Sequence, residues 1–164
     1  LVSDLLYYSL FRENKIKLIR SEFSLRNVVE ESLWLIRLQA NHKGINLQVE
    51  NNYRRDILES DERRLKQVLI NLLTNAVKFT KKGSITILIE PLNDSKLLRI
   101  DVIDNGVGIK RENVKKLFQP FSTFDTPDGA NSMGIGLGLF ISKLIVSQLG
   151  PLPELIVDSV ENEG

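Results

Sequence analysis

The chain has 164 residues, of which 42% are hydrophobic and 26% charged, and its formal net charge is +1. This length suffices for one sizeable core, and the small net charge excludes the strong basic field that attracts nucleic acids or anionic membranes. The chain has no cysteine and no apolar run near the roughly 18 residues that span a bilayer, so we expect one soluble unit with no disulfide, no thiolate metal site and no direct membrane contact.

The N-terminal third predicts a strand, a helix and a second strand. Apolar residues over 2–11 lead into a charged connector and a short strand, and Ser24 is a good N-cap for a helix from about Leu25 to His42. Gly44 follows at the C′ position, where a positive φ is tolerated. Apolar side chains recur on one broad face of this helix: Val28, Val29, Leu33, Leu35, Ile36 and Leu38. Alternation at Ile45, Leu47 and Val49 indicates the second strand.

The middle of the chain predicts a helix and a hairpin. Asp61 is an acidic N-cap for a helix that extends to Phe79, and Gly83 ends the segment that follows. Two β-rich runs come next, SITILIEPL and LLRIDVID, separated by the turn residues 93–95. This arrangement is typical of a β-hairpin.

The C-terminal third predicts a glycine-poor helix, a long irregular stretch, a helix from Gly136 to Leu149 and a last strand, LIVDSV. Helices interleaved with mostly antiparallel strands imply an α+β fold. We expect a two-layer α/β sandwich, in which about three helices cover one face of a mixed, mostly antiparallel sheet.

A polar stripe crosses the predicted helix that contains NLLTNAVKFT. Asn71, Asn75 and Lys78 recur at i, i+4 and i+7 beside the apolar face, so they can point at one object. A carboxamide oxygen is a hard ligand that suits Mg²⁺, and a lysine one turn later suits a phosphate. The same spacing also fits the solvated side of an amphipathic helix, so geometry alone leaves both interpretations open.

Two glycine segments follow. In DNGVGIK, Asp104 stands at the end of a strand before Gly106 and Gly108, which permit a tight turn close to a ligand or an ordinary Asn-Gly turn. In GIGLGLFISK, Gly134, Gly136 and Gly138 lead into an apolar helix, whose free N–H groups suit a polyphosphate. The spacing in GIGLGLFISK is not that of a dinucleotide-binding motif or a P-loop.

The stretch between these segments, LFQPFSTFDTPDGANSM, loses its apolar content after Phe121. This pattern predicts an anchor at Phe118 and Phe121 followed by a mobile lid, although a plain surface loop has a similar composition. Its length favours a functional role.

These four segments, in this order, resemble the catalytic and ATP-binding domain of histidine kinases, in the superfamily that also contains gyrase and heat-shock chaperone ATPases. NLLTNAVKFT is similar to the N box, DNGVGIK to the first glycine box, LFQPF to the F box and GIGLGLFISK to the second glycine box. The resemblance implies the Bergerat fold. Residues 1–22 resemble the end of a dimerisation helix and its connector, and residues 23–164 the ATP-binding domain.

The resemblance also implies a role for each matching residue. Asn75 corresponds to the Mg²⁺ ligand, Lys78 to the lysine on the phosphates and Phe79 to the aromatic residue beside adenine. Asp104 corresponds to the carboxylate that accepts from the adenine amino group, a charge-assisted hydrogen bond that favours ATP over GTP. The remaining nucleotide-binding positions are Asn71, Gly106, Gly108, Ile109, Phe121, Gly134, Gly136, Leu137 and Gly138, and the catalytic ones are Asn71 and Lys78.

In function, the resemblance implies a protein-histidine kinase fragment. Asn71 stands where gyrase-type ATPases carry a water-activating glutamate, so we expect ATP hydrolysis to be slow. Its cofactors would be ATP and Mg²⁺, and its partners a dimerisation domain that supplies the phosphoacceptor histidine and a response regulator receiver domain. The ending KFT resembles hybrid sensor kinases. We expect a cytoplasmic location, with a parent protein that is either soluble or membrane-anchored.

The chain departs from the family pattern in two places. His42 lacks the phosphoacceptor motif and is better explained as a partner of the helix C-terminal dipole, so the histidine must come from a separate domain. The chain also stops where a final strand is expected. The alternatives are a gyrase- or chaperone-type ATPase, against which Asn71 argues, and a non-catalytic nucleotide-binding or docking module.

Overall fold

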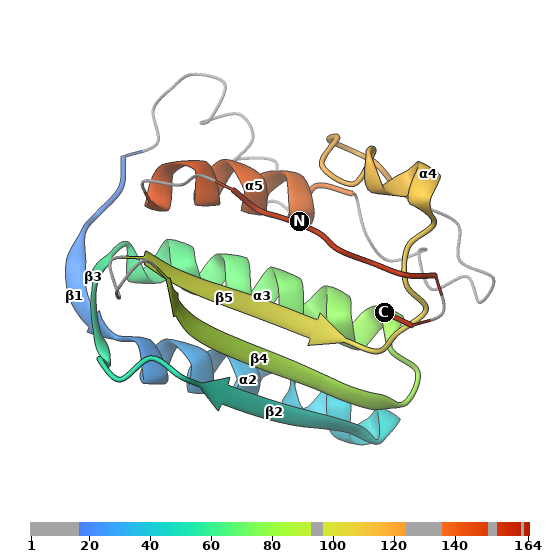
Figure 1. The fold of residues 1–164 in the computed structure, drawn as a ribbon, viewed down its shortest axis with the longest axis horizontal. Helices are drawn as coiled ribbons and strands as arrows, with labels where there is room; N and C mark the ends of the chain where they lie inside the picture. Colours follow the sequence, from blue (N-terminus) through green and yellow to red (C-terminus); the bar gives the residue numbers. More distant parts are fainter. Residues whose placement is uncertain (1–16, 93–96, 124–135, 151–153, 162) are drawn as a thin grey trace.

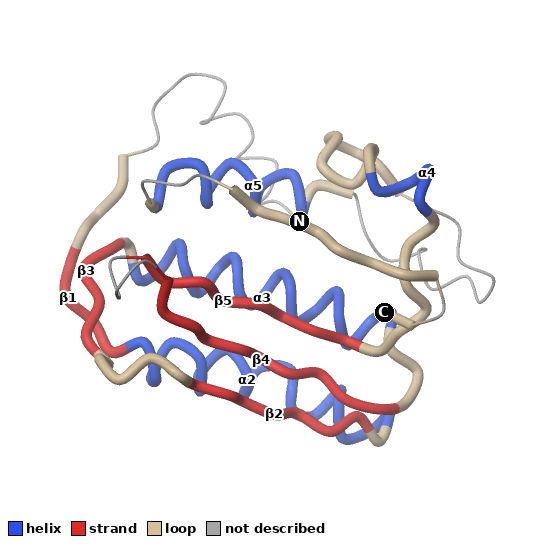
Figure 2. The backbone as a smooth tube through the Cα atoms, in the orientation of Figure 1, coloured by secondary structure: helices blue, strands red, loops and turns tan. Residues whose placement is uncertain are grey.

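The computed structural model describes residues 17–92, 97–123, 136–150, 154–161 and 163–164. Its largest sheet has the strand order β2-β4-β5, with β2 (Ile45–Asn51), β4 (Gly83–Leu92) and β5 (Leu97–Asp104). β2 is parallel to β4, and β4 is antiparallel to β5. β1 (Ser21–Ser24) and β3 (Ile57–Ser60) form a separate antiparallel pair. Figures 1 and 2 show this pair at one end of the larger sheet.

Three longer helices form the second layer. Figure 1 shows α2 (Leu25–Lys43) and α3 (Glu62–Phe79) against one face of the sheet, with α5 (Gly138–Leu149) beyond α3. The remaining helix, α4 (Arg111–Val114), is a single short turn after β5. The predicted fold class, a two-layer α/β sandwich with a mixed sheet, is therefore confirmed.

The core lies between the sheet and these helices. Alternate residues of β4, Ile85, Ile87 and Ile89, are at most 1% exposed, because that side of the strand faces the helical layer. They belong to one cluster with buried side chains of α2 and α3. A smaller cluster joins α3 to α5 and contains Val68, Leu137, Ile141 and Ile145. Helix α3 is therefore packed on two sides, against α2 and the sheet on one and against α5 on the other.

The predicted helix ends are confirmed at both long helices. The Ser24 hydroxyl accepts the Asn27 N–H at 3.1 Å, and Gly44 ends α2 with φ 66°. The Asp61 carboxylate accepts the Arg64 N–H at 3.0 Å and begins α3. These caps satisfy backbone groups that each helix leaves unpaired at its ends.

Two predictions for α2 and its neighbourhood were wrong. Leu35 and Leu38 were placed on the apolar face but are 51% and 70% exposed, because α2 lies at one edge of its layer and buries a narrower face. The strand β3 was not predicted, since its four residues alternate too briefly to stand out.

Among the described residues, no helix is long and apolar enough to cross a membrane.

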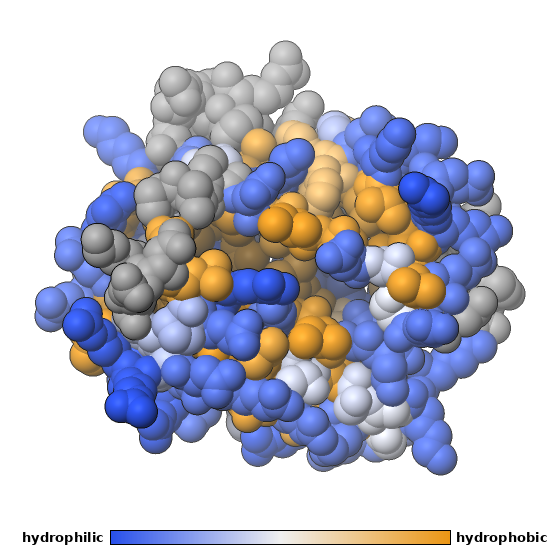
Figure 3. Space-filling view, viewed as in Figure 1, coloured by the Kyte–Doolittle hydropathy of each residue, from blue (hydrophilic) through white to orange (hydrophobic). Residues whose placement is uncertain are grey.

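The predicted last strand, LIVDSV, is also corrected. Residues 154–160 do not form a strand, and this segment is held to the rest of the molecule by contacts such as the hydrogen bond from the Ile109 N–H to the Ser159 hydroxyl. Figure 3 shows a depression in this face of the molecule that is bordered by hydrophobic residues. The predicted helical residues 2–11, the hairpin turn 93–95 and most of the predicted lid lie outside the described residues.

Candidate functional site

The polar stripe lies on α3, where Asn71, Asn75 and Lys78 are all half-buried. The end of this helix is held by Lys43, the last residue of α2. Its ammonium group donates to three backbone carbonyls, those of Val77 at 2.6 Å, Lys78 at 3.1 Å and Thr80 at 3.1 Å. A cation at a helix C-terminus also offsets the negative end of the helix dipole. The backbone that carries Lys78 and Phe79 is therefore fixed from a neighbouring helix.

The first glycine segment is joined directly to the end of α3. The Val107 N–H donates to the Phe79 carbonyl at 3.3 Å, and the Gly106 N–H donates to Asp104 Oδ1 at 2.9 Å. A Cβ at Gly106 would lie 2.7 Å from both the Phe79 carbonyl oxygen and Asp104 Oδ1. Only glycine permits this approach, so the structure brings Phe79, Asp104 and Gly106 together.

The rest of this loop is held by the C-terminal segment. Gly108 adopts φ 63°, and a Cβ there would collide with the Val160 carbonyl. The next residue, Ile109, donates its N–H to the Ser159 hydroxyl at 2.9 Å, and that hydroxyl donates to the Gly164 carbonyl at 3.0 Å. The loop after Asp104 is therefore anchored on both sides.

The second glycine segment meets the other end of the stripe. Asn71 Nδ2 donates to the Ser142 hydroxyl of α5 at 2.8 Å. A Cβ at Gly138 would collide with Asn71 Oδ1, so a larger residue in the first turn of α5 would displace this carboxamide. Leu137, the residue before that turn, is 2% exposed and packs in the α3–α5 cluster. These contacts join the start of α5 to α3.

The F-box residue Phe121 lies against the same segment. Gly136 has φ 72°, and a Cβ there would lie 2.7 Å from the Phe121 carbonyl carbon. Phe121 itself has φ 63°, which is uncommon for a residue with a side chain, and the residue is 52% exposed. The structure thus brings Phe121 to Gly136, while Gly134 lies outside the described residues.

Taken along α3, the predicted residues form one row with a partner segment at each end. Asn71 contacts α5, Phe79 contacts the loop after β5, and Asn75 lies between them, one turn from each. The Lys78 ammonium lies 4.9 Å from the centre of the Phe79 ring, a cation–π distance. A ligand that spans this row would meet the loop after β5 at one end and the start of α5 at the other.

Sequence reasoning missed three residues that support this site, Lys43, Ser142 and Ser159. Each acts through a backbone or side-chain contact far away in the sequence, so no local pattern identifies it. The nearest signal was Ser142, a hydroxyl inside a strongly apolar helix, four residues after Gly138.

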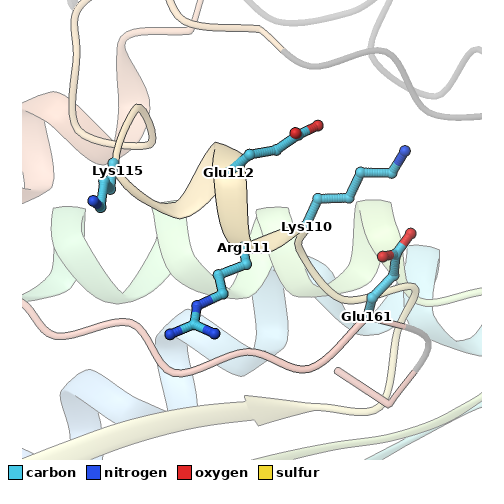
Figure 4. Close-up of a pocket in the computed structure, with 5 residues that line it drawn as sticks. All are labelled: Lys110, Arg111, Glu112, Lys115 and Glu161. Atoms are coloured by element: carbon cyan, nitrogen blue, oxygen red, sulfur yellow. The ribbon is translucent and has the colours of Figure 1, made fainter.

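A separate concavity of about 700 Å³ lies at the start of α4, after the loop that follows β5. Its lining residues carry three cations and two carboxylates: Lys110, Arg111, Glu112, Lys115 and Glu161. Figure 4 shows the Lys110 and Arg111 side chains pointing away from each other at the start of α4. None of the predicted site residues lines this concavity, and its mixed charges point to no single ligand.

Comparison with known proteins gives matches over most of the chain. Residues 60–164 match the family model described as "Histidine kinase-, DNA gyrase B-, and HSP90-like ATPase". The chain is 37% identical over 169 aligned residues to the sensor histidine kinase GacS of Pseudomonas protegens, an alignment that covers 100% of this chain and 18% of GacS. It is 34% identical to hybrid signal transduction histidine kinase B of Dictyostelium discoideum, covering 92% of this chain and 8% of that protein.

A solved structure agrees with the fold. The crystal structure of full-length ShkA in complex with AMPPNP has a TM-score of 0.76 to this chain and 26% sequence identity, and the match covers 89% of this chain and 30% of ShkA. The chain therefore spans less than a third of the length of each of these three proteins.

Proposed function

The chain belongs to the family of histidine kinase-, DNA gyrase B- and HSP90-like ATPases, and from this premise we propose that it is the ATP-binding catalytic domain of a sensor histidine kinase. In this role it positions Mg-ATP for phosphoryl transfer to a histidine on a separate dimerisation domain. The observation that carries the proposal is the row on α3, which contacts the loop after β5 at Phe79 and the start of α5 at Asn71.

The two ends of the row suit the two ends of a nucleotide. Asp104 and Phe79 offer a carboxylate and an aromatic ring for adenine, and Gly136 and Gly138 place no side chain over the free N–H groups at the start of α5, which suit phosphates. Lys78, near Phe79, supplies a positive charge that offsets phosphate charge. Gly106, Gly108, Ile109, Phe121 and Leu137 then shape the walls of the site.

The residues present also fit a magnesium ion. The described residues contain no group of three or more His, Cys, Asp or Glu that could hold a metal. Mg²⁺ in phosphoryl-transfer sites, however, takes most of its ligands from water and substrate phosphates, and needs few oxygens from the protein. The Asn75 carboxamide would hold it, and the bound ion would neutralise charge on the transferred phosphoryl group.

Transfer is favoured over hydrolysis at position 71. A water-activating base must accept a proton, and a carboxamide does so poorly. Asn71 moreover donates to Ser142 and keeps its oxygen against Gly138. This arrangement argues against a gyrase- or chaperone-type ATPase, which needs a carboxylate at this position.

The partners follow from the same proposal. The phosphoacceptor histidine would come from the dimerisation domain, and the phosphoryl group would pass to a response regulator receiver domain. One relative is named a hybrid signal transduction histidine kinase, which supports a hybrid-type parent. This domain would lie in the cytoplasm, where ATP is available.

Radiolabelled ATP distinguishes the candidate functions. The chain is incubated with Mg²⁺, [γ-³²P]ATP and a separate dimerisation domain from a histidine kinase of this family, and label on the histidine is expected. The Asn75→Ala variant should transfer no label. Thr74→Ala is the matched control, since Thr74 lies beside Asn75, is exposed and bonds only within its own helix among the described contacts.

Other outcomes would replace this proposal. ATP binding without transfer would support a non-catalytic module. Rapid phosphate release without label on the histidine would support an ATPase.

A further inference from the structure

Ser142 is a buried polar residue in an apolar helix. It is 1% exposed, and its hydroxyl accepts a hydrogen bond of 2.8 Å from Asn71 Nδ2. Ser147, on the same helix, is exposed and donates instead to the Leu144 carbonyl of its own helix. In the contacts described for these two serines, the Ser142 hydroxyl connects α5 to another helix, whereas the Ser147 hydroxyl bonds within α5.

The bond to Ser142 ties the Asn71 carboxamide to α5. With Nδ2 directed at Ser142, Oδ1 lies against Gly138, so close that a Cβ at Gly138 would collide with it. The carboxamide thus lies between Ser142, one turn into α5, and the backbone at the start of α5. Removing the Ser142 hydroxyl would take this partner from a part-buried amide, which is costly.

We propose that Ser142 is a positioning residue for the nucleotide: by fixing the Asn71 carboxamide, it holds the first turn of α5 in register with the polar row of α3. The start of α5 is where the phosphates would bind, and Asn75 lies one turn from Asn71. Ser142 itself, being buried behind Asn71, touches no nucleotide. This inference rests on the proposed function.

The position of Ser142 predicts that removing its hydroxyl lowers the affinity for some ligands and not for others. Its contact lies at the α5 end of the row, whereas adenine would bind at the other end, between Phe79 and Asp104. Removing the hydroxyl should therefore weaken binding of a nucleotide that carries phosphates and spare binding of adenosine. A residue that only stabilises the fold would affect both ligands alike or neither.

Calorimetry with ATP and with adenosine, each in the presence of Mg²⁺, measures the two affinities and their ratio. Ser142→Ala should weaken ATP binding about fivefold, as expected for one lost hydrogen bond to a half-buried partner, and leave adenosine affinity unchanged. Ser142→Cys keeps most of the side-chain volume but is a poor acceptor, so it should behave like Ser142→Ala. Ser142→Thr keeps the hydroxyl and should restore ATP affinity, and Ser147→Ala is the matched control that should bind both ligands normally.

The assignment is overturned if Ser142→Ala and Ser142→Cys bind ATP as the parent chain does, or if both lose ATP and adenosine affinity equally. Failure of the parent chain to bind ATP would overturn the proposed function and this assignment with it. A parent chain that binds ATP, with an unchanged ratio in the variants, would overturn this assignment alone.

Discussion

Asp104 is the residue on which, in the proposed site, recognition of the base would depend. Its Oδ1 accepts the Gly106 N–H within its own loop, an Asx-type turn that fixes the direction of the carboxylate. In the proposed site, the second oxygen would accept from the amino group of adenine. A guanine would present an oxygen there instead, so the same carboxylate should reject GTP.

Replacing Asp104 by asparagine tests this directly. The variant keeps an oxygen for the turn but loses the charge, so we expect ATP affinity measured by calorimetry to fall roughly tenfold, equivalent to about 1.4 kcal/mol. Asp101→Asn is the control, because Asp101 lies on the same strand and pairs with Arg99 at 2.8 Å. Unchanged ATP affinity in Asp104→Asn would exclude this residue from the binding site.

At the scale of single elements, the end of α3 depends on a lysine from α2. Lys43 donates to the carbonyls of Val77, Lys78 and Thr80, which the helix would otherwise leave to solvent. Lys43→Met keeps the aliphatic stem and removes these bonds. We expect the free energy of unfolding, measured with urea, to fall by about 1–2 kcal/mol.

Lys43→Arg should retain most of this stability, because a guanidinium group also donates to carbonyls. Lys116→Met, at an exposed lysine after α4, should change the free energy of unfolding by less than about 0.5 kcal/mol. A loss in Lys43→Met no larger than that of the control would mean that the cap contributes nothing measurable.

The start of α2 carries a pH-dependent contribution to stability. The Asp56 carboxylate accepts from the Ser24 hydroxyl at 2.7 Å and from the Arg26 N–H at 2.9 Å. The Ser24 bond, followed by the Arg26 bond, lowers the pKa of Asp56 below its ordinary value of 3.8. A lowered folded-state pKa means that the stabilisation is complete above the unfolded pKa and is lost as the pH falls through the folded one.

We therefore expect the unfolding midpoint of the parent chain to drop as the pH decreases from about 5 to below the ordinary pKa. Asp56→Asn removes the titrating group, so the drop should be smaller in this variant than in the parent chain. Urea unfolding at several pH values in this range, monitored by circular dichroism, measures how the midpoint depends on pH in the parent chain and in the variant. An equal dependence in both would show that Asp56 does not contribute.

At the scale of the whole molecule, the sequence predicted the layers well because the helix signals are strong. Ser24, Gly44 and Asp61 mark ends that local backbone chemistry fixes, and the structure confirms them. The errors occur where tertiary context decides. The exposure of Leu38 depends on which neighbours cover α2, and the pairing of β1 with β3 depends on segments that are distant in sequence.

The same division holds for the candidate site. The residues that would touch a ligand lie in recognisable motifs, so Asn71, Asp104 and Gly138 could be predicted. Their supports, such as Ser142, come from other elements and follow only from three-dimensional contacts. The roles of individual site residues remain predictions that the binding experiments above address.

The parallel pairing of β2 with β4 has a consequence for the order of folding. Ile45 lies opposite Gly83, so this ladder closes a loop that contains β3 and the whole of α3, whereas Leu92 and Leu97 face each other across the β4–β5 hairpin. Closing the longer loop costs more chain entropy, so the local hairpin can form first. During synthesis, β2 cannot pair with β4 until β4 has left the ribosome. By then α3, which bears the polar row and lies between the two strands in the sequence, has already been made.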